Sequence, residues 1–160
     1  EPTREPPAET FDLAEEIDVR LQAERGLART HGVRLLIEKH GDTRLTADRE
    51  ALVRAIRNLI NNAIKWSQAG QTVRMALHGD PEALSVEVHD QGPGIAIPDR
   101  ERVFTPFAQG SVPSGQRAGF GLGLAIIQAT AAQHHGSIAI DDSPSGGALL
   151  KLIIPRTAGA

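Results

Sequence analysis

Asp90-Gln91-Gly92-Pro93-Gly94 is the stretch that decides the fold of this chain, together with Gly119-Phe120-Gly121-Leu122-Gly123-Leu124 about thirty residues later. The first stretch follows a strand-like alternation in which Leu84, Val86 and Val88 face the same side. Asp90 keeps the parity of this apolar set, so its carboxylate is expected to point toward the core.

A carboxylate on the core side is costly unless a group donates a hydrogen bond to it. An amino-bearing ligand such as adenine would do so, and the glycines after Asp90 would let the ligand approach the backbone. The second stretch is a glycine string that opens a helix, where free amides and the helix dipole favour phosphate. A purine at one end and phosphates at the other indicate a nucleotide site.

The composition narrows the class of protein. The 160 residues suit one domain with a mostly aliphatic core, since 40% are hydrophobic and only 3% aromatic. The formal charge of −3 argues against nucleic-acid or anionic-membrane affinity, and the absence of cysteine excludes disulfides and thiolate metal sites. No apolar run reaches membrane-spanning length. The absence of cysteine fits a cytosolic protein, and because the chain starts at Glu1 without methionine, we expect a piece of a longer protein.

The periodicity predicts an α+β fold. Residues 1–10 are expected to be a linker, 11–155 the domain and 156–160 a tail. Helices are predicted over 12–30, after an N-cap at Asp48, and over 122–134. Strands are predicted over 33–37, 73–77, 83–89, 137–140 and 148–154. The long irregular stretch 91–119, with a helical turn at 99–103, is typical of a lid or binding loop. We expect one mixed, mostly antiparallel sheet of about five strands, covered on one face by three helices.

The helix after Asp48 carries asparagines at 58, 61 and 62, although asparagine is a poor helix former. Asn58, Asn62 and Lys65 share one side, which we expect to lie opposite the stripe that contains Leu59 and Ala63. Amide oxygens can hold Mg²⁺ without neutralising it, and a lysine can meet a phosphate as a point charge. A solvated polar face is the alternative interpretation.

Four segments together resemble the sequence boxes of bacterial sensor histidine kinases. Residues 58–65 resemble the N box, 90–95 the G1 box, 104–107 the F box and 119–124 the G2 box. The resemblance covers roughly residues 11–155. It implies the catalytic ATP-binding domain of such a kinase, with the Bergerat-type α/β sandwich of the GHKL superfamily, which includes gyrase, mismatch-repair and heat-shock chaperone ATPases.

At the adenine end, the resemblance implies that Asp90 accepts a hydrogen bond from the adenine amino group. Gly92 and Gly94 would lie beneath the base, and Ile95 would pack against the ring. Trp66 stands where the family usually has tyrosine, phenylalanine or histidine, and it would stack near the nucleotide.

At the phosphate end, the resemblance implies that Asn62 binds Mg²⁺, with Asn58 beside it and Lys65 on a phosphate. The lid would run from Phe107 to Gly119, with Arg117 as a phosphate contact or an exposed lid residue. The remaining nucleotide contacts would come from the glycine string and the start of its helix: Gly121, Leu122, Gly123 and Leu124.

The acceptor histidine of such kinases lies on a preceding helical hairpin. Five of the six histidines are followed by glycine or histidine, and His89 is followed by Asp90, which belongs to the segment 90–95 that resembles the G1 box. The acceptor is therefore expected outside this chain. The expected partners are this phosphoacceptor and dimerisation hairpin and a downstream response regulator, without nucleic acid or direct membrane insertion. The fragment itself is expected to be a monomeric cytosolic domain of a membrane-anchored sensor kinase. His134-His135-Gly136 also departs from the family's His-Gly-Gly.

Asn58 separates the possible activities. The related ATPases carry a glutamate at this position as a general base, and asparagine cannot take a proton from water. A protein histidine kinase, which transfers the γ-phosphoryl of ATP to histidine, is therefore favoured over hydrolysis. The alternatives are a GHKL-type ATPase and an anti-sigma-factor-type protein serine kinase, which also commonly keeps a glutamate there. A degenerate domain that binds partners without nucleotide is disfavoured by Asp90, Asn62 and Gly121.

Overall fold

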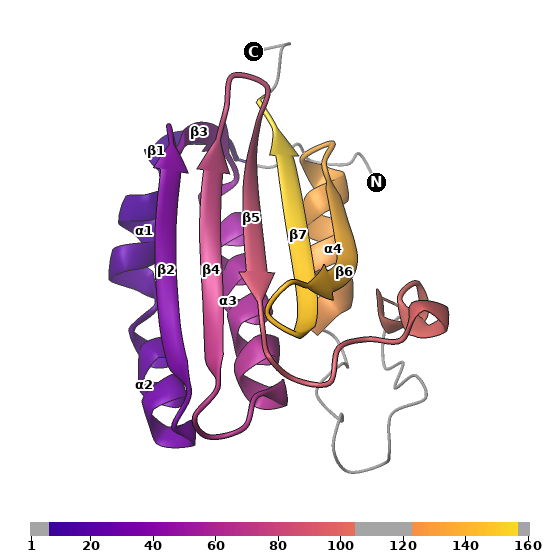
Figure 1. The fold of residues 1–160 in the computed structure, drawn as a ribbon. Helices are drawn as coiled ribbons and strands as arrows, with labels where there is room; N and C mark the ends of the chain where they lie inside the picture. The colour runs from indigo at the N-terminus through magenta and orange to yellow at the C-terminus, as the bar shows by residue number, and fades with distance from the viewer. Residues whose placement is uncertain (1–6, 105–122, 157–160) are drawn as a thin grey trace.

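A five-stranded sheet with the order β2-β4-β5-β7-β6 forms the frame of the domain (Figure 1). The structure is a computed structural model, and it describes residues 7–104 and 123–156. β2 and β4 are parallel, and the other neighbours are antiparallel. The sheet is therefore mixed and mostly antiparallel, as predicted. Its strands are β2 Arg34–Gly41, β4 Thr72–Gly79, β5 Ala83–His89, β6 Ser137–Ser143 and β7 Gly147–Pro155.

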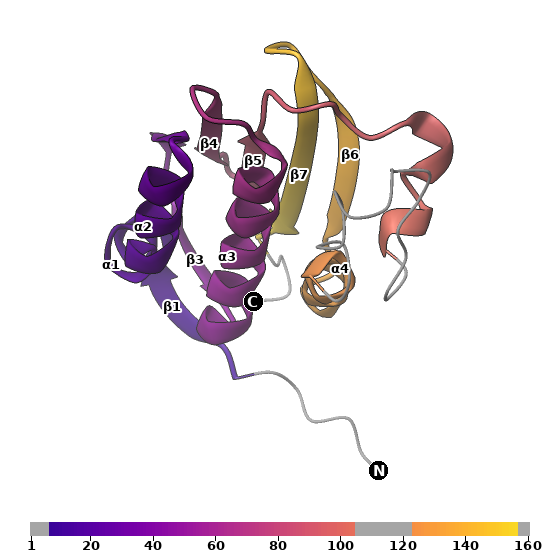
Figure 2. The ribbon, with the colours of Figure 1, turned by 90° about the horizontal axis from the view of Figure 1, so that it is seen from below.

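The helices lie on one face of this sheet, and no helix of the described residues covers the other face (Figure 2). Within the described residues, the α-helices are α1 Leu13–Arg20, α2 Gln22–His31, α3 Arg49–Trp66 and α4 Gly123–Gln133. Two short 3-10 helices, η1 Ile97–Asp99 and η2 Arg102–Phe104, follow β5. The predicted α+β class is confirmed. None of the helices in the described part of the chain is long and apolar enough to cross a membrane.

α3 is the helix that positions the site. Its N-cap is Asp48, as predicted, and the Asp48 side chain accepts a hydrogen bond from the Ala51 N–H at 3.1 Å. Leu52, Ile56 and Leu59 belong to the hydrophobic core and are at most 1% exposed. Each such side chain contributes roughly 1.5–3 kcal/mol when it leaves water. The helix is therefore fixed along its whole apolar face.

The N-terminal part differs from the prediction in two ways. The helix expected over 12–30 is two helices, because the chain turns at Leu21, which has φ −100° and ψ 24° and is fully buried. In addition, β1 Glu9–Asp12 pairs with β3 Arg44–Ala47 in a small antiparallel sheet that was not predicted. Glu9 and Thr10, assigned above to the linker, are thus part of a strand. Phe11, at 6% exposed, anchors this strand in the core.

Candidate nucleotide-binding site

Asp90, directly after β5, is the buried acid of the candidate site. It is 2% exposed, so the predicted inward orientation is confirmed. Its Oδ1 accepts hydrogen bonds from the Gly92 N–H at 2.9 Å and from the Ala148 N–H at 3.1 Å. The Asp90 N–H donates to the Ala148 carbonyl at 3.0 Å. Two backbone donors on one oxygen stabilise a charge that would otherwise be costly to bury.

A narrow cavity lies beside this carboxylate, between α3, the central strands and the start of α4. Its side chains nearly close it, since only about 10 Å³ of the space is wide enough for a water-sized sphere. Its walls are mainly apolar, with the Asp90 carboxylate and the Asn62 amide as polar groups: Leu59, Asn62, Ala63, Trp66, Val88, Asp90, Leu124 and Leu150. A mostly apolar lining with a few polar groups is typical of small-molecule sites in proteins.

The glycines after Asp90 occupy positions where a side chain would clash with neighbouring backbone or strain the chain. A Cβ built on Gly92 would lie 2.7 Å from the Trp66 carbonyl oxygen, nearer than real Cβ atoms approach. Gly94 has φ +77°, a conformation that favours glycine. Ile95 follows with 6% exposure, and its carbonyl accepts from Arg100 Nε at 2.9 Å. These residues fix the loop next to the cavity.

Asn62 lies in a different place from the one predicted. It is 6% exposed and lines the cavity with Leu59 and Ala63, whereas it was expected on the opposite side of the helix. The buried arc of α3 is wider than the apolar stripe in its sequence, because α4 packs against its flank. Asn58 is half-buried, and Lys65 is exposed, as a polar side would be.

The Asn62 amide is a buried polar group in the wall of the cavity. Its Nδ2 is buried and has no hydrogen-bond partner among the described residues. This NH₂ group is a donor, so it would be satisfied by an acceptor such as a phosphate oxygen, and a cation could be held only by the amide oxygen. Within 7–104 and 123–156, no three histidine, cysteine or acidic side chains are grouped as metal ligands. A cation here would therefore be held by amide oxygen and by the ligand's own phosphates.

Trp66 and Lys65 extend the site toward solvent. Trp66 is 5% exposed, lines the cavity and also borders a wider groove that it shares with Lys65, Gln91 and Gly92. Leu124, at the start of α4, closes the cavity from the other side. Gly123 begins the helix. The predicted contacts Phe107, Arg117, Gly119, Gly121 and Leu122 lie outside the described residues.

The turn between β6 and β7 is a part of the site that the sequence analysis missed. A Cβ on Gly147 would lie 2.3 Å from Asp90 Oδ1, so only glycine fits there. Ala148 then places its N–H on the same oxygen. The Gly146-Gly147 pair marks a turn in the sequence. Nothing local in the sequence indicates that this turn packs against Asp90.

Comparison with known proteins gives a consistent result. A family model described as histidine kinase-, DNA gyrase B- and HSP90-like ATPase matches residues 47–158. The chain is 32% identical over 146 residues to the histidine protein kinase DivJ of Caulobacter vibrioides, which covers 91% of this chain and 24% of DivJ. It is 36% identical over 140 residues to the kinase/phosphatase MprB of Mycobacterium sp. strain KMS. The alignment covers 87% of this chain and 26% of MprB.

Solved structures agree with these relatives. The mycobacterial sensor histidine kinase MprB superposes with a TM-score of 0.76 at 32% identity, with 93% of this chain and 97% of that chain covered. The catalytic domain of the histidine kinase ThkA superposes with a TM-score of 0.81 at 24% identity and shows the same fold. The superposition covers 94% of this chain and 99% of that chain. The chain spans about a quarter of the length of the two curated relatives. It belongs to the histidine kinase-, DNA gyrase B- and HSP90-like ATPase family.

Proposed function

We propose that this chain is the ATP-binding catalytic domain of a sensor histidine kinase and transfers the γ-phosphoryl group of ATP to a histidine on a separate domain. The observation that carries the proposal is the buried Asp90 carboxylate, held by two backbone amides in the wall of an apolar cavity. A carboxylate fixed in this way selects a ligand that donates a hydrogen bond. The adenine amino group is such a donor.

In this proposal, adenine enters the cavity and donates from its amino group to Asp90. The backbone of Gly92 and Gly94 lies beneath the base, and Ile95 packs against the ring. Trp66 contacts the nucleotide from α3. The supporting observation is that Trp66, Asp90 and the apolar walls meet around one space.

The phosphates are proposed to lie between α3 and the start of α4. Asn62 would hold Mg²⁺, which when bound offsets the charge of the phosphates. Asn58 would lie beside it, and Lys65 would contact a phosphate. Other phosphate and lid contacts are proposed from the sequence pattern alone: Phe107, Arg117, Gly119, Gly121, Leu122, Gly123 and Leu124.

The proposed reaction needs no general base from this chain. A histidine ring nitrogen attacks the γ-phosphorus with its own lone pair, a nitrogen–phosphorus bond forms, and the bond to the bridging oxygen breaks. ADP leaves with that electron pair. The chain supplies positioning and charge neutralisation, which account for most of phosphoryl-transfer catalysis. Asn58, where an ATPase would have a glutamate base, would keep hydrolysis slow.

The acceptor histidine is proposed to lie on a helical hairpin of the same kinase, which passes the phosphoryl group to a response regulator. Residues 11–155, together with Glu9 and Thr10 of β1, would form the catalytic unit, with the residues before Glu9 as the entry from the hairpin and 156–160 as a tail. The domain would be a monomeric, cytosolic part of a membrane-anchored kinase. The resemblance of the four boxes to those of sensor kinases supports this context.

Incubation with Mg²⁺ and γ-labelled ATP tests the proposal. The isolated chain should retain no label, and addition of the kinase's histidine-bearing hairpin should give labelled hairpin. A hairpin with the acceptor histidine replaced by alanine is the control and should stay unlabelled. The label should be acid-labile, as phosphohistidine is, whereas acid-stable label would favour the serine kinase. Rapid phosphate release by the chain alone would favour an ATPase and contradict the proposal.

A further inference from the structure

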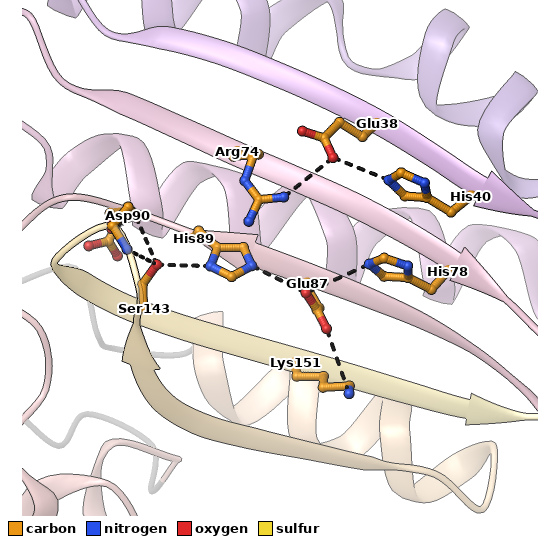
Figure 3. A network of polar contacts seen from close by, with 10 residues as sticks. Glu38, His40, Arg74, His78, Glu87, His89, Asp90, Ser143 and Lys151 are labelled. Carbon is orange, nitrogen blue, oxygen red and sulfur yellow. Dashed lines mark hydrogen bonds and ion pairs between the residues drawn. The ribbon is translucent and has the colours of Figure 1, made fainter.

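His89 lies directly before Asp90 on β5, and its side chain is on the open face of the sheet. It is 5% exposed, although the histidines beside it on this face, His40 and His78, are about half-exposed. Its Nδ1 lies 2.9 Å from Ser143 Oγ, and its Nε2 lies 3.2 Å from Glu87 Oε1 (Figure 3). A buried imidazole with partners on both nitrogens is held in one orientation.

The charges around His89 fix the direction of these hydrogen bonds. Burial raises the pKa of Glu87, but the hydrogen bond from His89 and the nearby His78 and Lys151 outweigh it, so the Glu87 pKa lies below its ordinary value. An ionised Glu87 only accepts, so Nε2 of His89 must donate. In neutral His89, Nδ1 therefore accepts from the Ser143 hydroxyl. Arg74 lies opposite His89 on the neighbouring strand β4, and its guanidinium forms an ion pair with Glu38.

From Ser143 the contacts continue to the buried acid. Ser143 Oγ lies 2.8 Å from Ser145 Oγ and also accepts from the Ser145 N–H at 3.3 Å. Ser145 Oγ lies 3.5 Å from the Asp90 carbonyl oxygen. The Gly146 N–H donates to the Ser143 carbonyl at 2.9 Å. These contacts hold the β6–β7 turn, and Ala148 leaves this turn with its N–H on Asp90 Oδ1.

We propose that His89 is a positioning residue for nucleotide binding: through Ser143 it holds the β6–β7 turn, and thereby keeps the Ala148 N–H on the Asp90 carboxylate. Its effect on affinity rests on the proposed function, whereas its effect on the turn does not. His89 lies on the face of the sheet away from the cavity-lining Val88, so it acts on the ligand only through Asp90 and the turn. His89 and Ser143 thus connect the open face of the sheet to Asp90, the proposed adenine-binding carboxylate.

Two substitutions of His89 separate this role from simple packing. Asparagine places a polar atom near the position of Nδ1, so His89→Asn keeps the bond to Ser143 and loses the one to Glu87. Glutamine places its amide near Nε2, so His89→Gln keeps the contact with Glu87 and loses the one to Ser143. Ser143→Ala removes the same bond from the other side with His89 intact. His78→Gln is the matched control, because His78 also meets Glu87, at 3.8 Å, on the same face.

The experiment measures amide hydrogen exchange at Ala148 without nucleotide and the Kd for Mg·ADP, both well below the unfolding temperature. In His89→Gln and Ser143→Ala, Ala148 should exchange faster and Mg·ADP should bind roughly three- to tenfold more weakly. His89→Asn and His78→Gln should resemble the wild type in both. The double variant His89→Gln/Ser143→Ala should be no weaker than either single variant, since both remove one bond.

Unchanged Ala148 exchange in both His89→Gln and Ser143→Ala would overturn the inference, whatever the affinities. Equal losses in His89→Asn and His89→Gln would also overturn it, because the loss would then reflect packing. A wild-type chain that binds no nucleotide would overturn the proposed function instead, and the exchange rates would still decide whether His89 holds the turn.

Discussion

Asp90 is the residue on which the proposed recognition of the ligand depends. Its hydrogen bonds allow a substitution that changes the ligand-binding group and keeps the contacts with the backbone. In Asp90→Asn, the amide oxygen can replace Oδ1 and still accept from the Gly92 and Ala148 amides. The side-chain NH₂ then replaces the second oxygen and donates where the carboxylate accepted. We expect a thermal unfolding midpoint close to that of the wild type and Mg·ADP binding weakened by at least roughly tenfold.

Trp66, the single tryptophan, provides the measurement for this prediction because it lines the cavity next to Asp90. A titration of its fluorescence with Mg·ADP gives the affinity of each variant. Asp80→Asn is a suitable control, since Asp80 lies in the β4–β5 turn at the other end of β5. Wild-type affinity in Asp90→Asn would remove Asp90 from the adenine site.

Asp12 gives a prediction about stability and pH. Its Oδ1 accepts from Thr43 Oγ1 at 2.6 Å and caps α1 by accepting from the Ala14 N–H at 3.0 Å. The Thr43 hydrogen bond, with the backbone donor of Ala14, holds the pKa of Asp12 below its ordinary value of 3.8. A carboxylate with a depressed pKa stabilises the fold above that ordinary value, and this contribution is lost as the pH falls through the lower folded-state pKa.

We therefore expect Asp12→Ala to lower the free energy of unfolding by about 1–2 kcal/mol at pH 7. The difference from the wild type should shrink as the pH falls below the ordinary pKa, because Asp12 is then being protonated. Urea unfolding at pH 7 and at several acidic pH values measures this. Asp18→Ala, on the exposed side of the same helix, should have little effect at any pH. A difference for Asp12→Ala that is independent of pH would refute the assignment.

At the scale of the elements, the end of α4 is where the chain departs from the family's His-Gly-Gly. His135 has φ 59°, in the left-handed region that costs a non-glycine residue roughly 1–2 kcal/mol. The next residue must be glycine, because a Cβ on Gly136 would lie 1.9 Å from the Ile153 carbonyl oxygen. His134 holds the helix end to α3, since its Nε2 accepts from the Asp48 N–H at 3.0 Å.

We expect His135→Gly to raise the free energy of unfolding by up to about 1 kcal/mol, because relief of the strained φ exceeds the entropy cost of glycine. Ala132→Gly, at an exposed position of the same helix end, is the control and should destabilise by roughly 0.5–1 kcal/mol. Denaturant unfolding measures both changes. Equal destabilisation by the two substitutions would show that His135 carries no backbone strain.

The elements differ in how well the sequence predicts them, and the reasons are physical. β5 and the Asp48 cap were predicted because alternation and capping are local signals. The pairing of β1 with β3 was missed because both strands are four residues long and far apart in the chain. The break at Leu21 was missed because Leu21 is buried and continues the apolar pattern of α1. The burial of Asn62 depends on what packs against α3, which its sequence does not show.

At the scale of the whole molecule, the layered arrangement places the site at one end of the sheet. Asp90 follows the central strand β5, Asn62 and Trp66 lie in the C-terminal half of α3, and Leu124 is the second residue of α4. Rigid elements thus hold the acid, the amide and the apolar walls. Of the contacts predicted from the sequence, Asn62, Trp66, Asp90 and Leu124 line the cavity. The sequence did not predict the contribution of the β6–β7 turn, which depends on the pairing of β5 with β7.

The most direct test of the account is calorimetric titration of the isolated chain with ADP and with ATP, in the presence and absence of Mg²⁺. We predict saturable binding of one nucleotide per chain, with a larger heat and a lower Kd when Mg²⁺ is present, because an amide-held cation brings the phosphates to α3. The absence of any magnesium-dependent heat with either nucleotide would contradict the account.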